Sequence, residues 1–395
     1  MAGLAFLATV VNYLDRQTLS VVAPVLTEQF HMSNVDYSRV VFAFMLAYTA
    51  MNAVSGPMID RLGTKLGYAL CIAWWSIAAM LHVFARGALS LGVFRFLLGM
   101  GEAGNWPAAV KVVAEWFPLE ERALASGIFN SGSSIGAALA PPLIAWILLR
   151  SGWRSAFLVV GAAGLIWLLA WLLFYYTPPN VRAETASPPI SMRKLLRSRW
   201  VSMFTASKIF SDPAWYFYVF WFPQYLKNAR GFDMVSIGKF AWIPFLTADA
   251  GNLLGGACAA MLLRRGIAVN WARKISVLLF AVLMTSAIPA VLVSNAFVSI
   301  ALISTATLGY TGALANMLAM PADRFPKNTV GSIWGIASMG AGFGGMIFSL
   351  ATGWVVDHYS YLPVFIGFGI SPLIAAGIIW SLPEQREGAA QDWNS

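Results

Sequence analysis

The chain carries a succession of apolar windows, each about 20 residues long, which are separated by short polar breaks. An α-helix needs a window of this length to cross the hydrocarbon core of a bilayer. Twelve windows can be placed, near residues 3–27, 38–58, 66–85, 88–112, 124–149, 153–177, 201–227, 236–262, 272–294, 297–320, 329–356 and 360–382. Hydrophobic residues make up 59% of the 395 residues and charged residues only 11%, far from the composition of a soluble domain. The pattern predicts an all-α membrane protein with twelve transmembrane helices, and it largely excludes a soluble enzyme.

The only long polar segment, residues 178–200, separates two sets of six windows. We therefore expect an N-terminal six-helix bundle over 1–177, a cytoplasmic linker over 178–200, a C-terminal six-helix bundle over 201–383 and a cytoplasmic tail over 384–395. An internal repeat supports two related halves, because a shift of 208 residues aligns several positions without a gap. It maps Phe117-Pro118 onto Phe325-Pro326, Gly127-Ile128 onto Gly335-Ile336, Gly132 onto Gly340, Gly136 onto Gly344, Phe157 onto Phe365 and Gly161 onto Gly369. Parallel repeats of this kind build many transporters.

The distribution of basic residues predicts the orientation. If the even-to-odd loops, the linker and the tail share one side, that side holds 16 Lys and Arg residues and the other side holds 7. The positive-inside rule then places both termini in the cytoplasm, and we expect a multi-pass protein of the inner (plasma) membrane. The first 14 residues carry no charge, so we expect no cleavable signal peptide and a first span that begins almost at Met1.

Few partners other than lipid fit this composition. The net charge of +9 is scattered between apolar runs, which disfavours nucleic-acid binding. Two cysteines, both in apolar runs, and three histidines predict neither a disulfide nor a metal cluster. We expect no cofactor.

Charged residues inside predicted spans mark the candidate site, because each costs about 2.5–3.5 kcal/mol to insert at the centre of a bilayer. Asp15 and Arg16 lie in the middle of the first span, and Arg95 and Glu102 lie in the fourth. Arg95 and Glu102 are seven residues apart, on one helix face but too far apart to touch, so each is expected to meet another helix. A guanidinium matches the two oxygens of a carboxylate, and a buried carboxylate can carry a proton. The alternative is a purely structural lattice of buried ion pairs.

Other polar groups in the spans are less informative. They are Tyr48, Asn130, Ser131, Lys208, Asp212, Asp249, Asn252 and Asn316. Lys208 and Asp212 are four residues apart and can simply pair with each other. The aromatic run 215–222 can stack on a sugar ring, pack inside the protein or face lipid.

Two glycine-containing motifs can be interpreted by their context. Gly99-x-Gly101-x-x-Gly104 imitates a dinucleotide fingerprint, but it lies inside an apolar span, where close helix packing by small residues is expected instead. Between the second and third spans, the sequence contains the motif residues Gly56, Asp60, Arg61, Gly63 and Lys65. Taken alone, these charges can be an ordinary positive-inside loop.

This loop motif, together with six spans, a linker and six spans, resembles the major facilitator superfamily over essentially the whole chain. Within it, the chain is similar to the anion:cation symporter family at three stretches, Asn12-Tyr13-Leu14-Asp15-Arg16, Arg95 through Gly104, and Glu121-Arg122-Ala123 leading to Gly127 through Gly136. The segments Ser211-Asp212-Pro213-Ala214-Trp215-Tyr216 and Phe240-Ala241-Trp242-Ile243-Pro244 look most like the hexuronate transporter branch, a less specific match.

The resemblance implies a proton-coupled importer of small organic anions, typically galacturonate or glucuronate, that works by alternating access as a monomer. Carried over residue by residue, it makes Asp15 and Glu102 the proton-coupling residues and Arg16 and Arg95 the carboxylate-binding residues. Tyr13 and Tyr48 fall where the family lines its cavity, and Asn130 is a further candidate for substrate binding.

Three other functions stay open at this stage. One is an anion exchanger that uses the same arginines, and another is an efflux antiporter for hydrophobic compounds, which the aromatic run would suit. A membrane-embedded enzyme is disfavoured, because the sequence offers neither metal-ligand spacing nor a Ser/His/Asp set. Sodium in place of protons also stays open.

Overall fold

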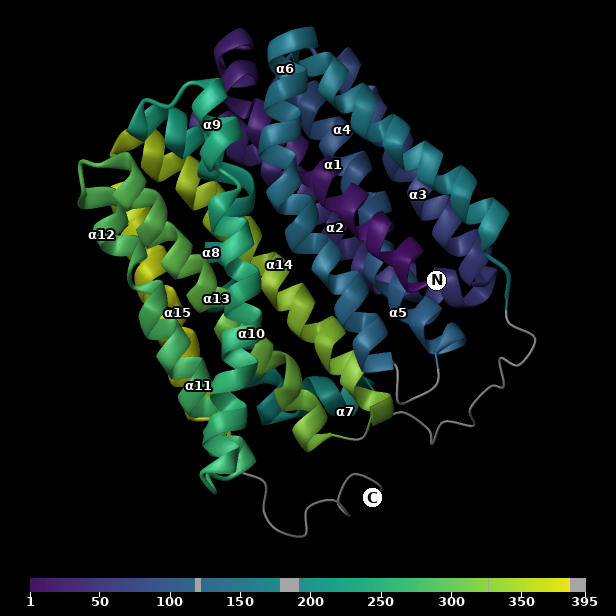
Figure 1. The fold of residues 1–395 in the computed structure, drawn as a ribbon, viewed down its shortest axis with the longest axis vertical. Helices are drawn as coiled ribbons and strands as arrows, with labels where there is room; N and C mark the ends of the chain where they lie inside the picture. Colours follow the sequence, from purple (N-terminus) through teal and green to yellow (C-terminus); the bar gives the residue numbers. More distant parts are fainter. Residues whose placement is uncertain (118–121, 178–191, 326, 384–395) are drawn as a thin grey trace. The chain divides into compact units, whose positions relative to one another are not determined.

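A computed structural model describes residues 1–117, 122–177, 192–325 and 327–383 (Figure 1). Within these residues it contains fifteen α-helices, one 3₁₀ helix and no strand, which confirms the predicted all-α class. Eight helical segments of the described residues are long and apolar enough to cross a membrane. α1 and α8 are not among the eight, and both carry buried charged residues in their middle. The predicted tail 384–395 and residues 178–191 of the predicted linker lie outside the described residues.

Every predicted span falls on one or two helices. The helices are α1 (Ala2–Gln29), α2 (Asn34–Leu62), α3 (Thr64–Leu81), η1 (His82–Phe84), α4 (Ala88–Glu102), α5 (Asn105–Trp116), α6 (Arg122–Phe174), α7 (Met192–Arg197), α8 (Arg199–Arg230), α9 (Met234–Phe240), α10 (Ile243–Arg264), α11 (Val269–Met284), α12 (Ala287–Leu292), α13 (Ala296–Arg324), α14 (Lys327–His358) and α15 (Leu362–Trp380). The fourth, eighth and ninth spans are each broken into two α-helices, and the third ends in the 3₁₀ helix η1. The fifth and sixth spans form the long α6, which turns at Gly152 with a φ of 79°. A left-handed φ of this kind is readily adopted only by glycine.

The described chain forms two compact units. Of the described residues, the first unit holds 1–117, 122–177, 216–246 and 345–364, and the second holds 192–215, 247–325, 327–344 and 365–383. The first unit therefore combines α1–α6 with parts of helices from the second half of the sequence. The division into bundles over 1–177 and 201–383 stays a prediction.

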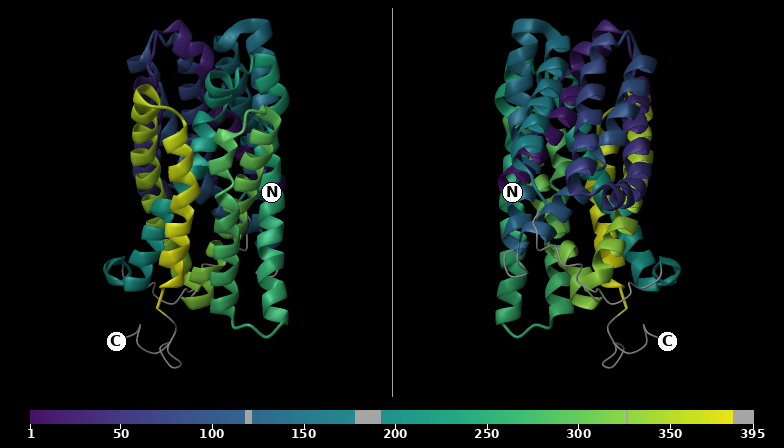
Figure 2. Two further views of the ribbon diagram at one scale, coloured as in Figure 1. Left: turned by 90° about the vertical axis from the view of Figure 1, so that its left-hand side faces the viewer. Right: turned by 90° about the vertical axis from the view of Figure 1, so that its right-hand side faces the viewer.

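In the first unit, segments from the second half of the sequence are tied to the start of α2. The carboxylate of Asp357 accepts hydrogen bonds from the backbone N–H groups of Asn34 (3.0 Å) and Val35 (2.8 Å), which belong to the first turn of α2. An acidic group is well placed there, because the first N–H groups of a helix lack partners within it. Asp357 lies close to the short turn between α14 and α15, the two yellow helices in Figure 2.

Lys227 and Glu28 connect α8 to the end of α1 in the same unit, with 2.8 Å between Nζ and Oε2. This hydrogen bond and the ammonium charge hold the pKa of the Glu28 carboxyl below its usual range. The Glu28 side chain is 78% exposed, so solvent screens the pair and its contribution to stability is small.

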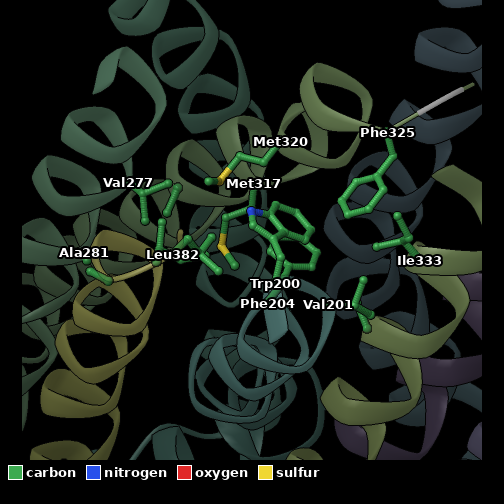
Figure 3. Packing of buried hydrophobic residues seen from close by; sticks show 14 of the residues in the cluster. Trp200, Val201, Phe204, Val277, Ala281, Met317, Met320, Phe325, Ile333 and Leu382 are labelled. Carbon is green, nitrogen blue, oxygen red and sulfur yellow. The ribbon is translucent and has the colours of Figure 1, made fainter. Parts of the chain in front are cut away.

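The second unit has its own apolar core, in which Trp200 of α8 is central (Figure 3). The Trp200 ring stacks on Phe204 with 4.9 Å between centroids and meets the edge of Phe325 at 5.2 Å. Met317 and Met320 of α13 complete this side of the cluster. Because aromatic rings bury large apolar surfaces, this cluster fixes α8 against α11, α13, α14 and α15.

Glycines at matching positions of the predicted repeat let pairs of helices pack closely in the structure. A Cβ atom on Gly136 of α6 would lie 2.6 Å from the Val10 carbonyl oxygen of α1. A Cβ on its repeat partner Gly344 of α14 would lie 2.3 Å from the Ile209 carbonyl oxygen of α8. In both halves of the repeat, a side chain at this position would clash with the backbone of the neighbouring helix.

This packing gives a stability prediction. We expect Gly136→Val to destabilise the protein by about 2 kcal/mol or more, because overpacking a close helix contact forces the backbones apart. Thermal unfolding in detergent measures the loss. Gly127→Val on the same helix is the matched control, since a Cβ there would meet nothing within 4 Å. Equal melting temperatures for the two variants would contradict the prediction.

Candidate functional site

The first and fourth predicted spans meet at an ion pair buried in the first unit. Arg16 of α1 donates from Nε to Oε2 of Glu102 at 3.0 Å, and its Nη2 lies 2.9 Å from the same oxygen. The two side chains are 5% and 0% exposed. Glu102 therefore does meet another helix, as its spacing from Arg95 predicted. The pair brings together two residues 86 positions apart in the sequence.

Glycines let the end of α4 pack closely against α2 and α3. A Cβ on Gly99 would lie 2.5 Å from the Phe44 carbonyl oxygen of α2, and one on Gly101 would lie 2.8 Å from the Trp75 nitrogen of α3. A Cβ on Gly104 would run into the Cys71 sulfur. The Gly99-x-Gly101-x-x-Gly104 motif is thus a set of close helix contacts, as its position inside a span predicted.

Aromatic rings surround the Arg16 guanidinium. Its central carbon lies 4.9 Å from the ring centroid of Tyr13, 4.6 Å from that of Tyr48 and 5.4 Å from that of Phe44. The structure therefore places the two predicted tyrosines, from α1 and α2, beside the same cation. Phe44 is missing from the sequence prediction, and its spacing of four residues before Tyr48 is the signal that could have found it. Such rings attract a cation through their negative faces.

Arg95 also contacts α1, but it faces different surroundings. Its Nη1 donates to the backbone carbonyl of Arg16 at 3.3 Å, and its guanidinium carbon lies 5.9 Å from the Phe157 ring centroid. His82, which sequence reasoning missed, stacks on the same Phe157 ring, with 4.6 Å between the ring centroids. Within the described residues, Nε and Nη2 of Arg95 are buried without a hydrogen-bond partner. Buried donors without an acceptor are costly, so these nitrogens are suited to receive an added oxygen ligand.

Several other polar atoms near this part of α1 are also unpartnered. Asp15 is 2% exposed, and its Oδ2 has no hydrogen-bond partner among the described residues. Asp15 interacts electrostatically with both Glu102 and Arg95. Gln17, which is fully buried with neither amide atom bonded to a described residue, was missed by sequence reasoning. Groups like these are suited to take up protons, water or a ligand.

Among the described residues, no polar contact joins Asn130 to Arg16. It is half-buried in α6, and its carbonyl accepts a hydrogen bond from the Ser133 hydroxyl at 2.7 Å. Ser133 in turn interacts with Tyr13. Asn130 is therefore near the site only through Ser133, and its role in binding stays a prediction.

The loop motif covers the last turns of α2, the turn at Gly63 and the start of α3, and two of its residues contact α5 and α6. Asp60 Oδ1 lies 2.8 Å from Nζ of Lys111, a residue of α5 that sequence reasoning did not assign to the motif. Gly63 adopts a φ of 80°, which permits the tight turn, and the carbonyl of Lys65 accepts a hydrogen bond from the Trp171 indole at 2.9 Å. Arg61 is exposed. Gly56 has open space around it, so its lack of a side chain is not required by packing.

No group of three or more metal-ligating side chains occurs within the part of the chain that the structure describes.

Comparisons with known proteins identify the family. The profile of the Major Facilitator Superfamily matches residues 5–270. The chain is 33% identical to the hexuronate transporter of Escherichia coli (strain K12), over 98% of this chain and 94% of that protein. It is 36% identical to the galacturonate transporter of Dickeya chrysanthemi, over 78% of this chain and 95% of that protein. Its fold matches the crystal structure of a D-xylose-proton symporter with a TM-score of 0.79 and 16% identity, covering 97% of both chains. With buried charged residues on apolar helices and this set of relatives, the chain belongs to the Major Facilitator Superfamily and is a multi-pass membrane transporter rather than an enzyme.

Proposed function

We propose that this transporter imports a sugar acid, most specifically a hexuronate such as galacturonate, together with protons across the inner membrane. The observation that carries the proposal is the buried Arg16–Glu102 pair within an aromatic surround. An arginine in such a place can bind a carboxylate through its two-pronged geometry. The relatives that transport hexuronate and galacturonate support a sugar acid as the substrate.

Competition for Arg16 can couple the substrate to the proton. While Glu102 is ionised, it occupies the guanidinium and the pair is neutral. When Glu102 takes up a proton, Arg16 is left with an uncompensated charge that a substrate carboxylate can neutralise. One proton then accompanies one carboxylate. An unpaired buried charge is costly. Protonation of Glu102 therefore favours binding of the substrate carboxylate to Arg16, and binding of that carboxylate favours protonation of Glu102.

Asp15 and Arg95 complete the proposed machinery. Asp15 provides a second proton site, so two protons would move inward with one monoanion and the net charge movement would be positive. The membrane potential contributes about 2.3 kcal/mol per charge per 100 mV, which favours such a cycle. Arg95 is proposed as the second carboxylate-binding residue, and Tyr13, Tyr48 and Asn130 as further substrate contacts. The two six-helix halves are proposed to alternate the access of this machinery between the two sides, with the loop motif taking part in the change.

The test is uptake of labelled galacturonate into proteoliposomes, with and without an inward pH gradient. We expect gradient-driven uptake by the wild type and loss of about 100-fold in Arg95→Ala, because a buried charged contact of this kind contributes several kcal/mol to binding. Arg154→Ala is the matched control, since Arg154 also donates to a backbone carbonyl (3.1 Å) and covers an aromatic ring, but is exposed. Uptake at the same rate with and without the pH gradient would overturn proton coupling.

Two further arms separate the alternatives. Preloading the vesicles with unlabelled galacturonate accelerates uptake without a pH gradient if the protein is an anion exchanger. Competition by lipophilic cations, and none by uronates, would instead indicate an efflux antiporter. Replacing the pH gradient by a sodium gradient tests the coupling ion.

A further inference from the structure

A groove on the surface of the first unit takes no part in the proposed mechanism. It lies between α2 and α4 and has a volume of about 540 Å³, which is within the range of small-molecule sites. Most of its lining is apolar, and two charged side chains complete it. The lining includes Leu89, Gly92, Val93 and Phe96 of α4, and Asp36 and Arg39 of α2.

The apolar wall of the groove is open to the surroundings of the protein. Leu89, Val93 and Phe96 are 84%, 51% and 39% exposed. They follow one another along α4 at spacings of four and three residues, so they share one face of the helix. In a multi-pass membrane protein, an exposed apolar face of this kind is a surface for lipid chains.

The depth of the groove fits one leaflet of a bilayer. α2 and α4 begin at the same level, because Gly99 packs on Phe44 and each of these residues lies ten or eleven positions after the start of its helix. The lining of α4 runs from Ala88, the first residue of the helix, to Leu97, which is about 14 Å at 1.5 Å per residue. Half of a hydrocarbon core is about 15 Å thick. The groove therefore extends from the helix starts over the depth of a single acyl chain.

The end of the groove at the start of α2 carries one cation and one anion. Nη1 of Arg39 lies 3.2 Å from Oδ1 of Asp36, and the two side chains are 69% and 35% exposed. The other Asp36 oxygen, Oδ2, accepts hydrogen bonds from the backbone N–H and the hydroxyl of Ser33, which fixes the carboxylate at the helix start. Among the described residues, the side-chain hydrogen bond of Arg39 is the one from Nη1 to Asp36, so Nε and Nη2 remain available as donors.

We propose that this groove binds one molecule of phosphatidylethanolamine, a phospholipid whose headgroup carries a phosphate and a primary ammonium group. One acyl chain lies along Leu89, Val93 and Phe96, the phosphate accepts hydrogen bonds from Arg39, and the ammonium group donates to Asp36. By the predicted orientation, the lipid belongs to the outer leaflet.

The charges of the groove distinguish this headgroup from others. A guanidinium suits a phosphate, because its fork can donate to two oxygens. The carboxylate of Asp36 repels a headgroup with net negative charge, such as that of phosphatidylglycerol. The quaternary ammonium of phosphatidylcholine has no N–H to donate to Asp36. The inference goes beyond the proposed function and does not depend on the transported substrate.

The test is native mass spectrometry of the delipidated protein in detergent, titrated with one lipid at a time. The wild type is expected to bind a first phosphatidylethanolamine about fivefold more tightly than phosphatidylcholine or phosphatidylglycerol with the same chains. Gly92→Leu fills the groove without a clash, because a Cβ there would meet nothing within 4 Å. It should raise the Kd of phosphatidylethanolamine about tenfold, since the new side chain displaces CH₂ groups of the lipid. Gly367→Leu on α15 is the matched control, with equally open space at its Cβ.

Two variants test the headgroup separately. Arg39→Ala should raise the Kd of phosphatidylethanolamine about fivefold and remove the preference over the other lipids. Asp36→Asn keeps a residue that can cap α2 and should shift the preference to phosphatidylglycerol, because the Arg39 charge is then uncompensated. Arg150→Ala is the control, since Arg150 is also exposed and covers an aromatic ring, that of Trp146, but does not line the groove.

The outcomes separate this inference from the function proposed above. A wild-type Kd for phosphatidylethanolamine in Gly92→Leu would overturn the groove as the lipid site. Equal affinities of the wild type for the three lipids, or a preference for phosphatidylglycerol, would overturn the role of the Asp36–Arg39 pair. The Kd is measured without substrate, so absence of galacturonate uptake would overturn only the proposed function.

Discussion

Arg16→Ala is expected to lower galacturonate uptake by about 100-fold or more. A charge-assisted carboxylate contact in a buried site is worth about 3 kcal/mol, and each 1.4 kcal/mol corresponds to a factor of ten. Initial uptake rates in proteoliposomes, normalised to the amount of inserted protein, measure the effect. Arg16→Lys should retain more activity than the alanine variant, because it keeps the charge but loses the fork that holds two oxygens.

Loss of uptake in Arg16→Ala could arise from unfolding, because Glu102 would remain as a buried charge without its partner. Breaking such a pair on one side costs about 3–5 kcal/mol of stability. Arg16→Ala/Glu102→Gln removes this penalty, so its melting temperature should recover while uptake does not. Arg154→Ala is the surface control, since Arg154 is exposed. Recovered uptake in the double variant would refute the assignment of Arg16 to substrate binding.

Much of this architecture could be read from the sequence because membrane helices have a simple physical signature. The apolar windows predicted the helices to within a few residues for α1, α2, α8 and α13. Charges in mid-span were conspicuous for the same reason, so Asp15, Arg16, Arg95 and Glu102 could be chosen without a structure. Hydropathy alone did not show the short break at Ala103 and Gly104 between α4 and α5, because both residues are compatible with an apolar run.

The partners of these charges could not be predicted in the same way. Helical periodicity identifies the face of a residue but not the helix that packs on that face, so the contact of Glu102 with Arg16 needed the structure. Phe44 could be found only through its spacing of four residues from Tyr48, because an apolar residue in an apolar span carries no signal of its own. The two arginines seemed equivalent in the sequence, whereas the structure places their guanidinium groups beside different rings, Tyr48 and Phe157.

Glu102→Gln is expected to bind galacturonate at all pH values and to lose accumulation driven by a pH gradient. Glutamine reproduces the shape of the protonated acid, and it leaves the Arg16 charge permanently available to the substrate. In the wild type, binding should weaken as the pH rises, because the ionised Glu102 then competes with the substrate for Arg16. Above the pH at which Glu102 ionises, each carboxylate that binds requires the uptake of one proton. The Kd for galacturonate should then rise about tenfold per pH unit, by the same proton linkage that makes stability depend on pH.

Binding and transport must be measured separately to test this. Isothermal titration in detergent between pH 6 and 8 should give a sloping Kd for the wild type and a flat one for Glu102→Gln. Counterflow in vesicles loaded with galacturonate should persist in the variant, since exchange requires the carrier to reorient with substrate bound and no net proton movement. Asp15→Asn is the informative comparison. Among the described residues, the ion pair of Arg16 is with Glu102 and not with Asp15, so loss of the Asp15 charge should leave the pH slope of binding unchanged and reduce only the accumulation ratio. If instead Glu102→Gln keeps the wild-type slope and Asp15→Asn removes it, then competition for Arg16 is not the coupling step, and the proton that drives uptake is carried by Asp15.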